Sequence, residues 1–185
     1  RMMVVNNRVR SSGKTTKSSS SKIGKESLEV ESGVSFINPT NTKKVSSNFG
    51  YRRDPFTRGR AYHSGVDIDT DYGANVRASM GGTVTYAGWM GGYGKLVIVT
   101  HENGYSTRYG HLSRINVKKG SVVKQGQLLG TAGSTGRSTG AHVHFEVRKN
   151  DKALNPAKIL NSKTKITDFD ESDELIEELD APEKD

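Results

Sequence analysis

Short runs of β-forming residues, each bounded by glycine, fill the chain from about Ser35 to Leu160. The clearest runs are GTVTYAG at 82–88, KLVIVTH at 95–101, YSTRYGHL at 105–112 and HVHFEVRK at 142–149. No helical pattern of 10 to 15 residues separates them, so parallel βαβ units are excluded. We therefore predict an all-β domain with an antiparallel sheet.

Two further segments complete the predicted domain. NVKKGSVVKQGQLLGTAG, at 116–133, has turn signals at Lys119-Gly120 and Gln125-Gly126 and is predicted to form a hairpin. NPAKIL, at 155–160, is predicted to form one short helical turn.

The flanks differ sharply from this β-rich region in composition. Residues 1–34 begin with a Ser- and Lys-rich run that has no acidic residue up to Lys25, and we predict a disordered basic linker. Residues 162–185 form an acidic tail: from Asp168 onward there are ten acidic residues and one lysine, a local charge of −9. Because the whole chain carries +8, the remainder carries +17. The predicted domain is thus 35–161, and its basic charge suits an anionic polymer, a lipid surface or a nucleic acid.

Cysteine is absent, so any metal must be held by His, Asp or Glu. The strongest candidate is HVH, because residues two apart in a strand project from the same face. His142 and His144 therefore point to one place. Spacing alone leaves open which of the two is a ligand and whether both only decorate a solvent face.

Three other features support a metal site near HVH. HSGVD places His63 and Asp67 four residues apart, and these are the ligand types that zinc accepts when thiolates are missing. The loop GSTGRSTGA, at 133–141, leads directly into HVH, and its glycines allow it to form one wall of a cleft. His111, in YGHL, is a candidate general base. The fifth histidine, His101, follows a strand at a turn and is predicted to be an ordinary surface residue.

At these residues the chain resembles the lysostaphin-like (LytM-like) peptidoglycan metallopeptidases, whose pattern is HxxxD followed by HxH with a further histidine between them. The resemblance covers about Val45 to Leu160. It implies that His63, Asp67 and His144 bind Zn²⁺ and that His111 and His142 are catalytic. It also implies a zinc-dependent endopeptidase whose partner is the stem peptide of peptidoglycan. The YRRDPFTRGR segment, at 51–60, resembles members that cut direct D-alanyl to diaminopimelate cross-links, hence a D,D-endopeptidase.

Several alternatives remain open. Within the same family, the chain could be a pentaglycine-bridge endopeptidase, or a non-catalytic or partner-activated regulator that binds the wall. The segment at 116–133 also resembles biotinyl and lipoyl carrier barrels, and Lys152 lies in a DKA context, but this leaves the histidines unexplained. Nucleic-acid binding ranks last, because stacking motifs and a recognition helix are missing from the sequence.

The expected location is the periplasm or cell envelope. The sequence has no run approaching the ~18 apolar residues of a membrane span, and it begins at Arg1 without a signal-peptide pattern. We expect a form from which an export or anchoring segment has been removed.

Overall fold

A computed structural model describes residues 35–160. The predicted basic linker and acidic tail lie outside the described residues. The strands are β1 Val45–Ser47, β2 Gly50–Arg53, β3 Arg60–His63, β4 Val66–Asp69, β5 Asn75–Arg77, β6 Gly82–Trp89, β7 Lys95–Thr100, β8 Tyr105–Ile115, β9 Val122–Val123, β10 Leu128–Ala132, β11 His142–Lys149 and β12 Lys152–Leu154. Two 3₁₀ turns, Gly91–Tyr93 and Glu102–Gly104, and one short helix, α1 Ala157–Leu160, complete the described elements.

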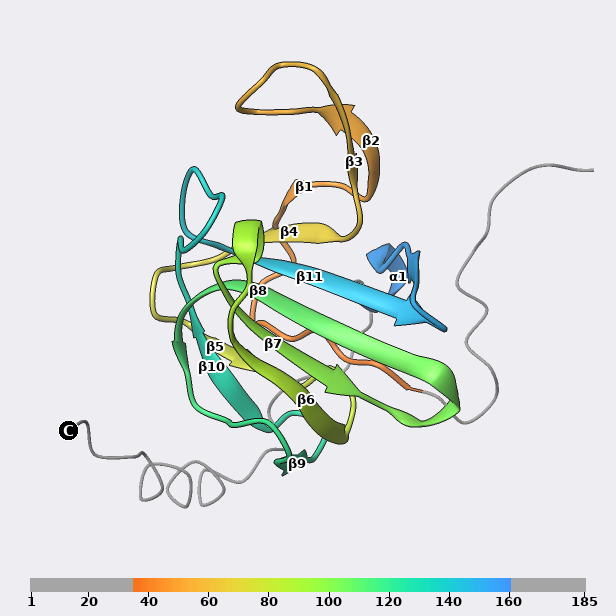
Figure 1. The fold of residues 1–185 in the computed structure, drawn as a ribbon. Helices are drawn as coiled ribbons and strands as arrows, with labels where there is room; N and C mark the ends of the chain where they lie inside the picture. Colours follow the sequence, from red (N-terminus) through yellow and green to blue (C-terminus); the bar gives the residue numbers. More distant parts are fainter. Residues whose placement is uncertain (1–34, 161–185) are drawn as a thin grey trace, which may run out of the picture.

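Ten of these strands form one antiparallel sheet (Figure 1). Its main path runs β1-β4-β11-β8-β7-β6-β9, while β12 pairs with β11, and β10 pairs with both β5 and β8. The remaining two, β2 and β3, form a hairpin that projects from the body at the top of Figure 1. The predicted antiparallel all-β fold is confirmed.

The central strand β11 shows how the sheet separates core from site. Val143, Phe145 and Val147 are fully buried in the hydrophobic core. The alternate residues His142, His144 and Glu146 project from the other face. This period-two division, visible in the sequence, leaves one face of the strand for polar chemistry.

The predicted hairpin at 116–133 is wrong. Its strands are β9, which pairs with β6, and β10, which pairs with β5 and β8. The two turns hydrogen-bond to other parts of the chain instead of to each other: the Gly120 amide donates to the Val84 carbonyl on β6, and the Gly126 amide donates to the carbonyl of Ala78, just after β5. The arms therefore diverge and pair with different parts of the sheet.

The predicted helical turn is confirmed as α1. Asn155 caps the N-terminus of this helix, because its Oδ1 accepts a hydrogen bond from the Ala157 amide at 3.1 Å. Ile159 and Leu160 are buried against the core. Within the described residues, none of the helices is long and apolar enough to cross a membrane.

His101 is buried, with 7% of its surface exposed, so the predicted surface position is wrong. Its Nδ1 donates to the Gly81 carbonyl at 2.8 Å, and its Nε2 accepts from the Thr107 hydroxyl at 2.8 Å. The buried Tyr109 hydroxyl extends this series of hydrogen bonds: it donates to the Thr107 hydroxyl at 2.7 Å and accepts from the Ser79 amide at 2.8 Å. Burial lowers the pKa of His101. The neutral imidazole thus joins Gly81 to Thr107 of β8 through two buried hydrogen bonds.

Candidate metal centre and cleft

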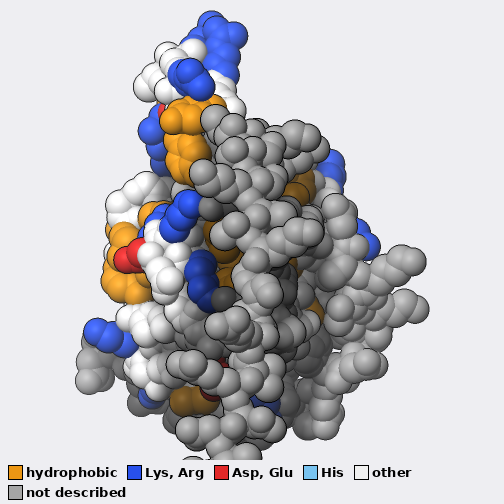
Figure 2. Space-filling model, turned by 90° about the vertical axis from the view of Figure 1, so that its right-hand side faces the viewer, with side chains coloured by type: hydrophobic (Ala, Val, Ile, Leu, Met, Phe, Trp, Pro, Cys, Tyr) orange, Lys and Arg blue, Asp and Glu red, His pale blue; other side chains and the backbone are white. Residues whose placement is uncertain are grey.

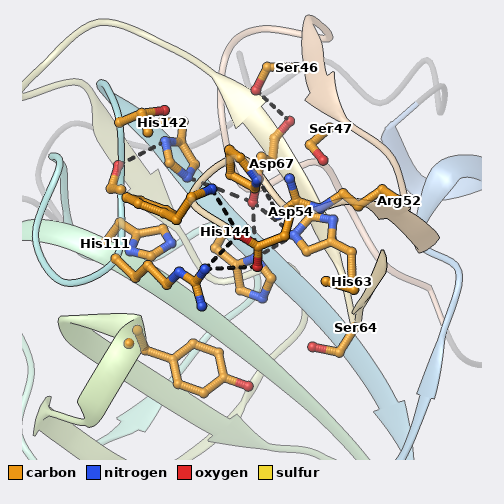
Figure 3. Close-up of a pocket in the computed structure, with 18 of the residues that line it drawn as sticks. Ser46, Ser47, Arg52, Asp54, His63, Ser64, Asp67, His111, His142 and His144 are labelled. Carbon is orange, nitrogen blue, oxygen red and sulfur yellow. Dashed lines mark hydrogen bonds and ion pairs between the residues drawn. The ribbon is translucent and has the colours of Figure 1, made fainter. Parts of the chain in front are cut away.

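A cleft of about 530 Å³ lies between the β2–β3 hairpin and the glycine-rich loop 133–141 (Figure 3). Its floor comes from β4, β8 and β11. The loop contributes Arg137, Ser138 and Thr139 to one wall, as predicted. All five residues singled out in the sequence line this cleft: His63, Asp67, His111, His142 and His144.

Three of these side chains converge on one point. His63 Nε2 lies 3.1 Å from Asp67 Oδ1 and 3.1 Å from His144 Nδ1, and His144 Nδ1 lies 2.9 Å from Asp67 Oδ1. The sheet sets this geometry, because Asp67 and His144 are register partners across β4 and β11. Gly65 brings the β3–β4 turn against β11, where a Cβ would meet the Phe145 carbonyl oxygen at 2.2 Å.

The outer nitrogens of both imidazoles are occupied. His63 Nδ1 donates to the Asn48 carbonyl at 2.9 Å, and His144 Nε2 donates to Glu146 Oε1 at 2.8 Å. The inner nitrogens are therefore the atoms that contact the Asp67 carboxylate, and they can do so either by donating a proton to it or by sharing a bound cation with it. Tetrahedral ligands at about 2.0–2.1 Å from zinc would lie about 3.3 Å apart. The three residues consequently fit a metal ion of this size, and they leave one position open.

Asp67 is held as an anion. Burial by itself would raise its pKa, but hydrogen bonds and charge from His144 and His63 outweigh burial and hold the pKa well below its usual range. A negative ligand at this point attracts a divalent cation and offsets half of its charge.

Glu146 holds the proposed ligand His144 in place by a hydrogen bond, and it was not predicted from the sequence. Its side chain is fully buried and accepts from His144, from Ser64 Oγ at 2.6 Å, from Tyr93 Oη at 2.7 Å and from Arg148 Nε at 2.7 Å. Burial favours the neutral acid, yet these partners, His144 first, hold the pKa of Glu146 below its usual range. The signal was present in the sequence, since Glu146 follows His144 by two residues on the same strand face.

His111 and His142 lie beside the ligand triangle, with ring centroids 4.7 Å apart. Each ring is fixed through Nδ1, which lies 2.7 Å from the Thr135 carbonyl oxygen in His111 and 2.8 Å from the Gly140 carbonyl oxygen in His142. His142 Nε2 lies 3.7 Å from Asp67 Oδ1. Burial lowers the pKa of His111 to about 4. With Nδ1 protonated and donating, the Nε2 lone pairs are available to accept a proton.

His111 also has a strained backbone. Its φ is +60°, in the left-handed region that non-glycine residues seldom adopt. The residue lies where β8 changes partner, because Gly110 pairs with β11 and Leu112 pairs with β10. Strain of this kind gathers at functional sites and is maintained by the surrounding structure.

The hairpin and the glycine-rich loop are joined across one end of the cleft. Arg137 Nη2 contacts both oxygens of Asp54 at 2.6 and 2.7 Å, and its guanidinium lies 4.5 Å from the centre of the Phe56 ring. Tyr62 also lines the cleft, whereas Tyr109 belongs to the core and Arg108 pairs with Glu146 outside the lining.

Comparison with known proteins finds relatives in both sequence and structure. The model of "Peptidase family M23" matches residues 61–156. The DD-carboxypeptidase/endopeptidase Mpg of Neisseria meningitidis is 39% identical over 142 residues, which are 77% of this chain and 33% of the relative. The chain thus spans about a third of that relative's length.

Two solved structures share the fold and a substantial part of the sequence. A zinc-containing peptidase from Vibrio cholerae has a TM-score of 0.62 at 33% identity, over 71% of this chain and 41% of the other. The lysostaphin catalytic domain from Staphylococcus simulans has a TM-score of 0.58 at 35% identity, over 64% of this chain and 92% of the other. The match to the family model covers more than half of the chain, and with these likenesses it shows that the chain belongs to peptidase family M23.

Proposed function

We propose that this chain is a zinc-dependent endopeptidase that hydrolyses the peptide cross-links of bacterial peptidoglycan. The observation that carries the proposal is the ligand triangle of His63, Asp67 and His144, whose outer nitrogens are tied to Asn48 and Glu146. Three protein ligands with one open position are typical of catalytic zinc, whereas structural sites use four. The zinc-containing relative supports the choice of metal.

Each residue has a proposed role in hydrolysis. Zn²⁺ held by the triangle supplies Lewis acidity toward water and toward the scissile carbonyl. His111 and His142, fixed by backbone carbonyls, orient the attacking water with their Nε2 atoms and accept its proton. One of them then donates that proton to the leaving amine as the C–N bond breaks. Because burial lowers its pKa to about 4, His111 is neutral at pH 7, and its Nε2 carries a lone pair that can accept a hydrogen bond from the water.

The proposed bond is the D,D cross-link between D-alanine and diaminopimelate. The name of the Neisseria relative, DD-carboxypeptidase/endopeptidase, supports it. The second candidate is a pentaglycine-bridge endopeptidase. A wall-binding regulator, or an enzyme that needs an activating partner, is the third candidate within the family.

The proposed location is the periplasm or cell envelope, reached by export, because peptidoglycan lies there. We keep the proposed division into a linker at 1–34, the peptidase domain at 35–161 and a tail at 162–185. A membrane anchor outside this chain is compatible with it, and nucleic acid is not a proposed partner.

Digestion of purified peptidoglycan tests the proposal. Sacculi of the diaminopimelate and pentaglycine types would be incubated with zinc-loaded wild type, His142→Ala and wild type with chelator, followed by mass analysis of the muropeptides. New D-alanyl ends from the first substrate, absent in both controls, are expected. Cleavage confined to glycine bridges would replace the D,D assignment, and zinc binding without any cleavage would favour the regulator.

A further inference from the structure

Arg52, on β2, places a positive charge inside the cleft without a hydrogen-bond partner among the described residues. Its Nη2 lies 3.8 Å from Asp67 Oδ2, which is too long for a hydrogen bond. The side chain is one-third exposed and lines the cleft. Its guanidinium therefore has donors that a ligand can use.

The other arginines near the cleft are differently placed. Arg137 is held by both oxygens of Asp54. Arg53, the next residue on β2, points to the opposite, exposed side, and its Nε donates to the Arg58 carbonyl at 3.2 Å. Figure 2 shows Lys and Arg side chains, in blue, at the tip of this hairpin. Arg52 is thus the arginine of β2 that faces the catalytic machinery.

The electrostatics at Arg52 favour an anionic ligand. Asp67 Oδ1 belongs to the ligand triangle, so a cation held there takes up the carboxylate's negative charge. The guanidinium then adds a further positive charge in a half-buried cleft, where charges are weakly screened. This end of the cleft consequently attracts a carboxylate.

We propose that Arg52 binds the free carboxylate on the carbon that carries the leaving nitrogen. This inference rests on the proposed function and specifies its substrate class. In a D-alanyl to diaminopimelate cross-link, that carbon bears a carboxylate, whereas an interior glycine of a pentaglycine bridge has none. A terminal D-alanyl-D-alanine has the same arrangement, so the inference also covers trimming of uncross-linked stems.

The dimensions of the cleft agree with this placement. Figure 3 shows His142 and Arg52 on opposite sides of Asp67. Since each lies within 4 Å of that carboxylate, His142 Nε2 and Arg52 Nη2 are at most about 10 Å apart. Three bonds, less than about 4 Å, separate the scissile carbonyl carbon from the substrate carboxylate carbon. The leaving nitrogen can therefore face His142 while the carboxylate reaches Arg52.

Arg52 takes no part in making or breaking bonds. Water adds to the carbonyl carbon, the C–N bond breaks, and the proton passes to the leaving nitrogen as before. The residue selects the substrate by charge. Two other roles, stabilising the oxyanion or supporting Asp67, would act on every peptide substrate equally, and this difference makes the proposal testable.

The experiment compares two synthetic cross-linked dimers that differ only at this carboxylate, free in one and amidated in the other. Values of kcat/KM would be measured for zinc-loaded wild type, Arg52→Gln, Arg52→Lys and the control Arg53→Gln. Zinc content and circular dichroism verify that each variant is metallated and folded. Binding of both uncleaved dimers to His142→Ala, with and without Arg52→Gln, gives a readout that does not depend on turnover.

Wild type is expected to prefer the free carboxylate about ten- to hundredfold, the scale of one charge-assisted contact. Arg52→Gln should lose that preference, Arg52→Lys should retain part of it, and Arg53→Gln should match wild type. An equal loss on both dimers, or a preference that survives in Arg52→Gln, overturns the proposal. If wild type cuts neither dimer, the proposed hydrolysis fails, and the binding measurements still decide the Arg52 contact.

Discussion

At the scale of single residues, the centre depends on which nitrogen of each imidazole holds its proton. Glu146 engages His144 Nε2 and leaves Nδ1 as the nitrogen that can bind a metal ion, and the Asn48 carbonyl engages His63 Nδ1 and leaves Nε2 for the same purpose. Partners of this kind orient metal ligands and increase their basicity. Glu146 is therefore a positioning residue for the centre.

Glu146→Gln is expected to weaken zinc binding about 10- to 100-fold, because the amide keeps the hydrogen bond but removes the charge behind His144. Competition with a chromophoric chelator measures the Kd. Glu102→Gln, which removes a carboxylate from an exposed turn, is the matched control. An unchanged Kd in Glu146→Gln would mean that Glu146 serves folding alone.

His101 is expected to make the free energy of unfolding fall as pH is lowered. Its folded-state pKa is depressed by burial, so below about pH 6.5 the unfolded chain binds a proton that the folded chain resists. Each such group costs up to about 1.4 kcal/mol per pH unit in that range. Urea unfolding at pH 7.0 and 5.5 should therefore show a smaller loss for His101→Gln than for wild type. Equal losses would show that His101 titrates alike in both states.

At the scale of elements, the glycine-rich loop is fastened to the start of β7 by close backbone contact. Gly94 has a φ of +66°, and a Cβ there would lie 2.4 Å from the Thr135 carbonyl carbon. The Thr135 carbonyl oxygen accepts from His111 Nδ1. The approach of two backbones thus sets the position of a candidate catalytic ring.

Gly94→Ala is expected to destabilise the fold by about 2 kcal/mol and to lower kcat more than it raises KM, because Thr135 must move and release His111. Thermal unfolding and steady-state kinetics measure the two effects. Gly120→Ala is the control, since its φ is +94° but no atom lies within 4 Å of the added Cβ. It should cost only the backbone strain and leave kcat unchanged. Similar kinetics in both variants would contradict the role of the loop.

Local patterns predicted most of the elements but not all of the pairings. The strands at 82–88, 95–101, 105–112 and 142–149 were readable because each alternates or is apolar between turn signals. The segment at 116–133 was predicted as a hairpin, yet pairing is decided by the whole sheet, where β6, β5 and β8 offered better partners. The buried position of His101 was missed for the same reason, since its partners are Gly81, just before β6, and Thr107, on β8.

The candidate site was predictable to a similar depth. HxxxD and HxH identified four of the five predicted site residues, because the motif spacing is local and strand periodicity is reliable, and His111 was singled out separately in YGHL. Asn48 and Arg52 were not singled out, as their roles depend on where the β2–β3 hairpin folds relative to β4 and β11. The division between ligand and catalytic histidines came from family resemblance and stays a prediction.

At the scale of the whole molecule, the centre ties together segments that are distant in sequence. His63 and Asp67 join the projecting hairpin to β4, and His144 belongs to the central strand β11. A cation bound by all three therefore stabilises the folded chain relative to the unfolded one.

Zinc is expected to stabilise the fold by about 4 kcal/mol when its free concentration is a thousand times the Kd. Chelator should lower the Tm of wild type and of His142→Ala, since the latter keeps all three proposed ligands. His144→Ala should unfold at the same Tm with or without zinc. A zinc-dependent Tm in that variant would place the metal elsewhere.

Titration of zinc into metal-free protein tests the central claim most directly. Hydrolysis of one cross-linked dimer would be followed for wild type and for His142→Ala, with bound zinc measured in the same samples. We predict that wild-type activity rises linearly with added zinc and saturates at one zinc per chain. His142→Ala should bind the same amount of zinc but show no turnover. Hydrolysis by the metal-free protein, or full turnover by zinc-loaded His142→Ala, would contradict it.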